Sequence, residues 1–267
     1  IYCRYFNIFW AYSSAWIECW TSNPMVKGSK PFGPILFKFK NNIYKIFGPK
    51  PKQVLPMVQD GATKEQVLEE TDHTVGLDNV SLSIKKGEIF VCMGLSGSGK
   101  STLIRHINRL IDPTAGQVTV DGVDVLSLDD KEILDFRKKT MSMVFQRFGL
   151  FPHKTIIENV AYGLEIQEVP EAQRKEIAQG QIDSVGLQGF ENQYPAQLSG
   201  GMQQRVGLAR ALATDPQILL MDEAFSALDH LIRSDMQSQL VELQSKLKKT
   251  IVFITHDLDE SLKLGDQ

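Results

Sequence analysis

Four apolar runs along the chain end in polar or glycine-rich turns, and none of them alternates strictly between apolar and polar residues. The runs cover residues 88–93, 141–145, 217–221 and 250–255. Parallel strands that are covered on both faces carry such continuous runs, so each run predicts a buried strand. Residues 100–110 follow the first run with apolar positions at helical spacing. The pattern predicts an α/β fold with a mostly parallel sheet and helices on both of its faces.

The stretch at residues 147–202 has a different character and separates the second predicted strand from the third. Residues 156–162 and 171–185 have helical composition, and prolines punctuate the stretch. Residues 202–213 then form an amphipathic pattern typical of a further helix. We therefore expect a helical subdomain at about 147–202, inserted before the third strand.

The turn after the first strand matches the pattern of a phosphate-binding loop, Gly-x4-Gly-Lys-Ser, from Gly94 to Ser101. Its glycines let backbone N–H groups point at phosphate oxygens, and the following helix adds the positive end of its dipole. Lys100 would reach the β- and γ-phosphates and Ser101 would bind Mg²⁺, so the expected ligands are ATP and Mg²⁺. The alternative, a glycine-rich turn beside a surface lysine, leaves the match of the octapeptide and its flanks unexplained. The residues expected to bind nucleotide here are Gly94, Ser96, Gly97, Ser98, Gly99, Lys100, Ser101 and Thr102.

The other strand ends carry groups suited to ATP hydrolysis. Asp222 and Glu223 follow the third strand, where carboxylates fall in the ligand crevice of a parallel sheet. Asp222 is suited to hold Mg²⁺ through water, and Glu223 is the candidate general base. His256 would contact the γ-phosphate, and Gln146 would contact Mg²⁺ and the attacking water. The predicted catalytic residues are Lys100, Gln146, Glu223 and His256, and the predicted metal ligands are Ser101, Gln146 and Asp222.

A second anion site is predicted where residues 198–203 read Leu-Ser-Gly-Gly-Met-Gln, at the start of the helix ending at Ala213. Its exposed N–H groups could bind phosphate, although one nucleotide needs only one such site. If two copies pair head to tail, Ser199 of each copy faces the γ-phosphate held by the other, and ATP joins them. The alternative is an ordinary helix that Ser199 caps. The residues expected to bind nucleotide in this segment are Ser199, Gly200, Gly201 and Gln203.

These motifs, in this order between about Lys40 and Gln267, resemble the ATP-binding subunit of an ABC transporter. The resemblance implies a P-loop NTPase of RecA-like fold, with an antiparallel β part beside the mostly parallel sheet and an inserted α-helical subdomain. It implies that Tyr44 stacks on the adenine and that Gln146 is the Q-loop residue. It also implies that His256 is the switch histidine and that Asp229, which ends the D-loop, contributes to nucleotide binding.

Three segments make the resemblance more specific, to bacterial importers of glycine betaine and L-proline. They are residues 108–114, residues 222–229, and an extra segment between Tyr44 and Gly76 in which a capping box, Thr63-Lys-Glu-Gln, opens a short helix. The resemblance implies ATP hydrolysis in the osmoprotective transport of quaternary amines. The implied partners are a second copy of the chain, a membrane permease and, indirectly, a periplasmic or extracellular substrate-binding protein. The implied location is peripheral, at the cytoplasmic face of the bacterial membrane.

The same resemblance suggests a point of contact with the permease. In such importers the groove beside Gln146 receives a coupling helix of the membrane subunit. Phe148, Leu150 and Phe151 crowd a segment that also holds Gly149 and Pro152, and we expect them to form an apolar socket. Ordinary core packing is the alternative.

The two ends of the chain depart from the family pattern. Residues 1–39 hold all three tryptophans and a Pro/Gly/Lys-rich join, and we expect this extension to lie outside the fold. The ABC domain would then cover residues 40–267 and be truncated at its C-terminus, because the family continues with further strands. No run in the extension is long and apolar enough for a membrane helix.

Composition limits the other functions that the motifs allow. The chain has 267 residues, 42% hydrophobic residues and a net charge of −3, without a basic stripe that would favour nucleic acid. Its three cysteines show neither metal-binding spacing nor a disulfide framework. Three alternatives remain: a soluble ABC-type ATPase acting on nucleic acid or ribosomes, an importer ATPase for another small solute such as an amino acid, and a regulatory module that binds nucleotide without turnover.

Overall fold

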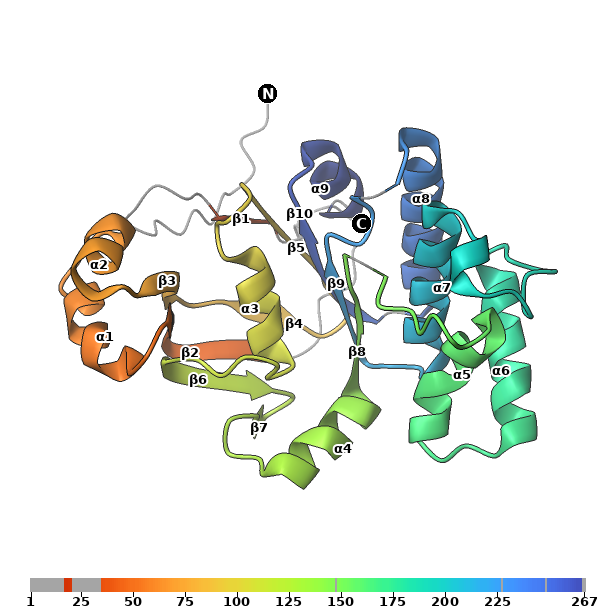
Figure 1. Cartoon of the computed structure of the whole chain (residues 1–267), viewed down its shortest axis with the longest axis horizontal. Helices are drawn as coiled ribbons and strands as arrows, with labels where there is room; N and C mark the ends of the chain where they lie inside the picture. Colours follow the sequence, from red (N-terminus) through yellow and green to blue (C-terminus); the bar gives the residue numbers. More distant parts are fainter. Residues whose placement is uncertain (1–16, 21–34, 147, 227, 248, 266–267) are drawn as a thin grey trace. The chain divides into compact units, whose positions relative to one another are not determined.

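The computed structural model describes residues 17–20, 35–146, 148–226, 228–247 and 249–265. The chain divides into two compact units. The first unit comprises Ile1–Ile133 with Ile254–Gln267, and the second comprises Leu134–Phe253. Figure 1 shows the elements of both units along the chain.

An antiparallel sheet forms much of the first unit and is built around one long strand, β2 (Ile35–Phe47). This strand pairs with β3 (Thr74–Val80), β4 (Ser83–Lys85) and β6 (Ala115–Val120), and β6 also pairs with β7 (Val123–Asp124). Register shifts near Lys45 show that β3 carries extra residues opposite β2, which is a bulge in β3. The antiparallel β part expected from the sequence is thereby confirmed.

Two short helices connect β2 to β3, α1 (Pro51–Gln59) and α2 (Lys64–Thr71). Thr63 caps α2 and forms the expected capping box with Gln66, whose side chain accepts from the Thr63 backbone N–H. α1 buries Val54 and Val58, and α2 buries Val67, in a cluster with residues of β2 and β3. The resulting cluster consists of Tyr44, Ile46, Val54, Val58, Val67 and Val75.

The phosphate-binding loop joins β5 (Ile89–Gly94) to α3 (Lys100–Ile107). The strand β1 (Ile17–Trp20) pairs antiparallel with β5, and α9 (Leu258–Gly265) also belongs to this unit. β1 and the first residues of β2 extend the fold into the segment before residue 40 that the sequence placed outside it. The start of the fold therefore moves to Ile35 or earlier.

Helix α3 ends three residues before the predicted end at Leu110, because Arg109 adopts a left-handed backbone conformation with φ of 51°. The Arg109 guanidinium donates to the backbone carbonyls of Val125 and Leu128. These contacts with a distant loop hold the residue outside the helix.

The strands of the second unit are β8 (Met141–Val144), β9 (Ile218–Asp222) and the first four residues of β10 (Thr250–Thr255). β8 and β9 are parallel neighbours, and β9 lies between β8 and β10. Every residue of β9 and β10 is buried, as the continuous apolar runs predicted.

The other regular elements of this unit are helices. α4 (Asp130–Thr140), of which residues 134–140 belong to this unit, leads into β8. α5 (Ile156–Ile166), α6 (Glu171–Ser184) and α7 (Gly200–Ala213) follow, and α8 (His230–Leu247) comes after β9. α7 packs against both α5 and α6. The helices expected within residues 147–202 are therefore present.

Candidate functional site

The phosphate-binding loop has the backbone that its glycines predict. Gly97 and Gly99 have φ of +79° and +96°, in the left-handed region that disfavours side chains. A β-carbon on Gly99 would also collide with the backbone carbonyl oxygen of Gly76 on β3, whereas one on Gly97 would meet open space. Gly99 is thus required both for its conformation and for the close approach of two backbones, and Gly97 borders a space that a ligand can occupy.

Polar side chains of the loop are held against its own backbone. The buried Lys100 ammonium donates to the carbonyl oxygens of Gly94 at 2.7 Å and Leu95 at 2.8 Å. The Ser98 hydroxyl oxygen is buried and has no hydrogen-bond partner among the described residues. An orphaned hydroxyl beside a buried cation fits an anionic ligand, because both groups bind phosphate oxygens. The other residues predicted in this loop occupy the turn and the first helical turn, namely Ser96, Ser101 and Thr102.

Gln146 and Glu223, which are 77 positions apart, come together in the second unit. The Gln146 amide Nε2 donates to the Glu223 carboxylate Oε2 at 3.0 Å. Glu223 has φ of 47°, and its carbonyl oxygen accepts from the N–H and the hydroxyl of Ser226. A non-glycine residue in the left-handed region costs about 1–2 kcal/mol, so the Ser226 contacts stabilise a strained conformation at this side chain.

Asp222 ends β9 as a buried carboxylate, 3% exposed, directly before Glu223. His256 follows β10, belongs to the first unit and is exposed. The turn after His256 is ordered by Thr255, whose hydroxyl donates to Glu260 and accepts from the N–H of Asp257. Each of these two site residues therefore stands at a strand end, as predicted.

The Leu-Ser-Gly-Gly-Met-Gln segment forms the N-terminus of α7. Ser199 is its N-cap, and the Ser199 hydroxyl accepts from the N–H of Met202 at 3.3 Å. Gln203 donates to the carbonyls of Pro195 and Leu198, which fixes the approach to the helix. The Gln203 side chain therefore acts within its own chain. A Ser199 cap is expected whether this segment is a second anion site or the start of an ordinary helix, so the cap does not distinguish the two hypotheses.

The two glycines of this segment differ in their surroundings. Gly201 is buried, and a β-carbon there would lie 3.2 Å from the Ile232 side chain of α8. Gly200 is exposed at the helix end. Asp229, the D-loop aspartate, caps α8 by accepting from the N–H of Ile232 at 3.0 Å. Gly201 therefore serves the close packing of two helices, and Gly200 keeps the N-terminus of α7 open.

The structure gives no support to Tyr44 as an adenine platform, because its ring is only 8% exposed and belongs to the cluster beneath α1 and α2. Burial raises the pKa of Tyr44, and its hydroxyl bonds the Gln59 side chain. Phe47, at the end of β2, is 39% exposed. Its ring lies over Gly76, where a β-carbon would be 2.6 Å from the ring, and Gly76 in turn abuts Gly99. Phe47 is therefore the aromatic residue beside the phosphate-binding loop.

Sequence reasoning missed Phe47, although a signal was present. Lys45 and Phe47 are two positions apart on one strand and so share a face, and a charged residue marks that face as exposed. Tyr44 and Ile46 occupy the buried face.

The sequence matches a known protein family, and the fold matches a solved structure. Residues 77–226, which contain the phosphate-binding loop, Gln146, the α7 N-terminus and Glu223, match the family described as ABC transporter. The chain belongs to the ABC transporter family. A solved structure described as a dimeric post-hydrolysis state of the ATP-binding cassette MJ0796 bound to ADP and Pi superposes with a TM-score of 0.72. It is 34% identical to this chain, and the match covers 85% of this chain and 91% of that one. The ABC cassette fold predicted from the sequence is confirmed.

Within the ABC family, several similar proteins carry names that refer to glycine betaine. GbuA of Listeria monocytogenes, a glycine betaine/carnitine transport ATP-binding protein, is 60% identical over 83% of this chain and 56% of its own length. OpuAA of Bacillus subtilis, a glycine betaine transport ATP-binding protein, is 55% identical over 88% of this chain. ProV of Escherichia coli, named for glycine betaine/proline betaine transport, is 54% identical over 85%. The chain spans about half the length of these relatives, because 56% of each is covered.

The described residues contain neither a membrane-spanning helix nor a cluster of metal-binding side chains. Within the described ranges, no helix has the length and apolar character needed to cross a membrane. The same residues contain no group of three or more His, Cys, Asp or Glu side chains that could hold a metal ion. A magnesium ion that enters with a nucleotide needs no such cluster, since Mg²⁺ is bound by one or two carboxylates with substrate phosphates and water.

Proposed function

We propose that the chain is the ATP-binding and hydrolysing subunit of an ABC importer for glycine betaine, proline betaine or related quaternary amines. The hydrogen bond between Gln146 and Glu223 carries the catalytic part of this proposal, since it orients a carboxylate that a phosphate-binding protein without turnover would not need. The names of the relatives support the transport part.

The phosphate groups of ATP would be bound by the loop from Gly94 to Ser101. Backbone N–H groups around Gly97 and Gly99 supply donors, and Lys100 supplies a positive charge at the β- and γ-phosphates. When bound, Mg²⁺ would neutralise the charge that develops on the phosphate oxygens. Ser101, Asp222 and Gln146 would hold it, and all three offer the oxygen ligands that Mg²⁺ prefers. Because Gln146 donates through Nε2, its Oε1 is the atom left for this role.

In hydrolysis, a water molecule that Glu223 deprotonates would attack the γ-phosphorus, and the bond from that phosphorus to the bridging oxygen would break and leave ADP. A positioned general base contributes about 10²–10⁴ in rate. Gln146 keeps the carboxylate oriented, and the Ser226 contacts hold the Glu223 backbone in place. His256 would contact the γ-phosphate and keep the water in line. In this mechanism Glu223 accepts the proton of the water, and Lys100 stabilises the negative charge that develops on the leaving ADP.

ATP would also join two copies of the chain. The α7 N-terminus, with Ser199 and the exposed Gly200, offers N–H groups to the γ-phosphate held by the partner copy. Two similar solved structures are described as dimeric forms of MJ0796, which supports this arrangement. The adenine would stack on Phe47 in place of Tyr44, because of these two rings Phe47 is the exposed one and lies against Gly76, beside the loop.

Transport would require a membrane permease and a substrate-binding protein, with this subunit peripheral at the cytoplasmic face of the membrane. Phe148, Leu150 and Phe151 are half-buried, as residues of a shallow apolar socket would be. The Phe151 ring packs against the Tyr162 ring of α5, with ring centroids 4.5 Å apart, so α5 supports one residue of the socket. A charged residue at position 151 should uncouple transport while leaving basal ATP hydrolysis unchanged.

The names of the relatives support a proposal about the class of the transported compound. Besides glycine betaine, the names of similar proteins include trimethylamine N-oxide (TmoW of Pelagibacter ubique, 49% identical) and choline (OpuBA of Bacillus subtilis, 44% identical). These compounds share a compact, fully substituted nitrogen. We therefore propose a substrate of this class and not an ordinary amino acid.

The test is MgATP-dependent dimerisation of the Glu223→Gln protein, measured by size-exclusion chromatography with light scattering. Removing the base should slow hydrolysis by about 10²–10⁴ and trap the dimer. We expect a dimer only with MgATP, and a monomer when Ser199→Arg is added. Glu69→Gln, an exposed carboxylate on α2, is the matched control and should behave as the unchanged chain does. A monomer that still binds MgATP would refute the clamp, and absence of MgATP binding would refute the nucleotide site.

A further inference from the structure

The Lys45 side chain lies on one face of the exposed Phe47 ring. Its ammonium lies over the Phe47 ring, 5.0 Å from the centroid, and donates to the backbone carbonyl of Asp112 at 2.8 Å. Both side chains leave β2 on the same face, since they are two residues apart. The Lys45 ammonium therefore has a defined position, between the face of the Phe47 ring and the Asp112 carbonyl oxygen.

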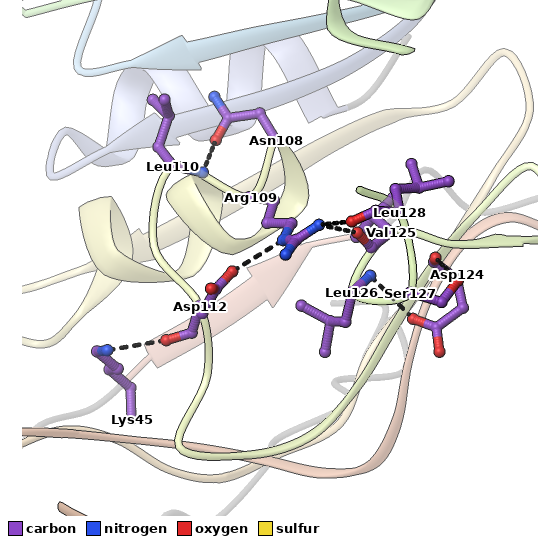
Figure 2. A network of polar contacts seen from close by, with 10 residues as sticks. All are labelled: Lys45, Asn108, Arg109, Leu110, Asp112, Asp124, Val125, Leu126, Ser127 and Leu128. Atoms are coloured by element: carbon purple, nitrogen blue, oxygen red, sulfur yellow. Dashed lines mark hydrogen bonds and ion pairs between the residues drawn. The ribbon is translucent and has the colours of Figure 1, made fainter. Parts of the chain in front are cut away.

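The carbonyl that holds Lys45 is itself anchored, as Figure 2 shows. Arg109 forms an ion pair through Nε with the Asp112 carboxylate at 3.0 Å. The same guanidinium donates to the carbonyls of Val125 at 3.0 Å and Leu128 at 2.6 Å. The Arg109 side chain is 19% exposed, so these contacts are partly shielded from water. Lys45 is thus bound to a loop that begins where helix α3 ends and that Arg109 anchors by three contacts.

The contacts of Phe47 leave one face of its ring available. The ring meets Gly76 through Cε2 and Cδ2, which form one edge. The Lys45 ammonium covers one face, so the exposed surface includes the opposite face. Gly76 lies against Gly99 of the phosphate-binding loop, which puts this opposite face within reach of a base whose phosphates the loop holds.

We infer that Lys45 is a positioning residue for the nucleotide base: it holds Phe47 from behind, and a purine stacks on the other face. The inference rests on the proposed ATP-binding function. A cation over one face draws π-electron density toward itself, which favours stacking of an electron-rich ring on the other face. Burial lowers the pKa of Lys45, and the nearby Asp112 carboxylate opposes this shift and so favours the charged form.

The experiment measures the dissociation constants of MgATP and of magnesium tripolyphosphate, which lacks the base, by calorimetry on the whole chain. Lys45→Met removes the charge but keeps an unbranched side chain, and Lys45→Arg restores the charge. We expect Lys45→Met to weaken MgATP about two- to fivefold, the range of an exposed cation–π contact, with tripolyphosphate unchanged. Lys45→Arg should restore most of the affinity. In a Phe47→Leu background, Lys45→Met should have no further effect on MgATP.

The outcomes separate this inference from the proposed function. An equal loss for both ligands would show that Lys45 acts on phosphate, and would overturn the positioning role. An unchanged or tighter MgATP affinity in Lys45→Met would also overturn it, the latter because Lys45 would then compete with the base for the ring. If the unchanged chain binds neither ligand, the proposed function itself fails. Circular dichroism of each variant confirms that the comparison is made between folded proteins.

Discussion

Asn159 offers a demanding test of how the segment after Gln146 is held, because it is a fully buried side chain whose partners all lie in that segment. Its Oδ1 accepts from the N–H of Phe151 at 2.8 Å. Its Nδ2 lies within 3.1 Å of three backbone carbonyl oxygens, those of Phe151, Lys154 and Thr155. Helix α5 thereby fixes the turn that carries the proposed permease socket.

The cost of Asn159→Ala can be worked out from these contacts. An amide nitrogen carries two hydrogens, so the three carbonyls share two donors, and the side chain makes three full hydrogen bonds in all. At about 1 kcal/mol net for each bond, the loss is about 3 kcal/mol, and the Phe151 N–H is left without its partner. We expect the free energy of opening the segment around Phe151 to fall by this amount.

Hydrogen exchange followed by mass spectrometry measures this opening directly. A loss of about 3 kcal/mol corresponds to exchange about a hundredfold faster in a peptide covering residues 148–155. Gln167→Ala is the matched control, because Gln167 ends the same helix but makes one exposed hydrogen bond, to the Lys138 carbonyl. The control should change exchange less than about fivefold. If Asn159→Ala and the control behave alike, Asn159 does not hold the turn, and the reasoning from buried hydrogen bonds is refuted.

Two further predictions concern the first unit. Gly99→Ala should lower the free energy of unfolding in a denaturant titration by more than Gly97→Ala does, because only the β-carbon at position 99 would collide with the Gly76 carbonyl, while both carry about 1–2 kcal/mol of left-handed backbone strain; equal losses would contradict the close approach. Burial lowers the pKa of His106 below its ordinary 6.5, and its Nε2 has no partner among the described residues, so the neutral ring is favoured in the folded state. Its contribution to stability is complete above pH 6.5 and is lost as the pH falls from 6.5 toward the lowered pKa, by up to about 1.4 kcal/mol per pH unit. Thermal unfolding between pH 5 and pH 8 should show a smaller acid loss for His106→Leu, and identical profiles would disprove this assignment.

Much of the fold follows from local patterns that tertiary contacts do not alter. Continuous apolar runs located β9 and β10, which are buried at every position, and the capping box at Thr63 located the start of α2. The phosphate-binding loop was equally accessible, because the φ angles it needs are those that only glycine adopts readily at Gly97 and Gly99. Gln146 and Glu223 were each predicted at a strand end, but the hydrogen bond between them required the fold.

The sequence by itself therefore determined the features that depend on neighbours along the chain. These are the strands given by apolar runs, the helix start given by a capping residue, the glycine conformations of the phosphate-binding loop and the spacing of the motifs. Only the tertiary structure decided the burial and the backbone conformation of residues that contact segments far away in the sequence. α1 and α2 pack over Tyr44 and bury it, and the hydrogen bonds of Arg109 with the loop at residues 125–128 hold this residue outside α3. Burial and backbone conformation at these positions result from contacts between residues far apart in sequence, and a local pattern carries no record of such contacts.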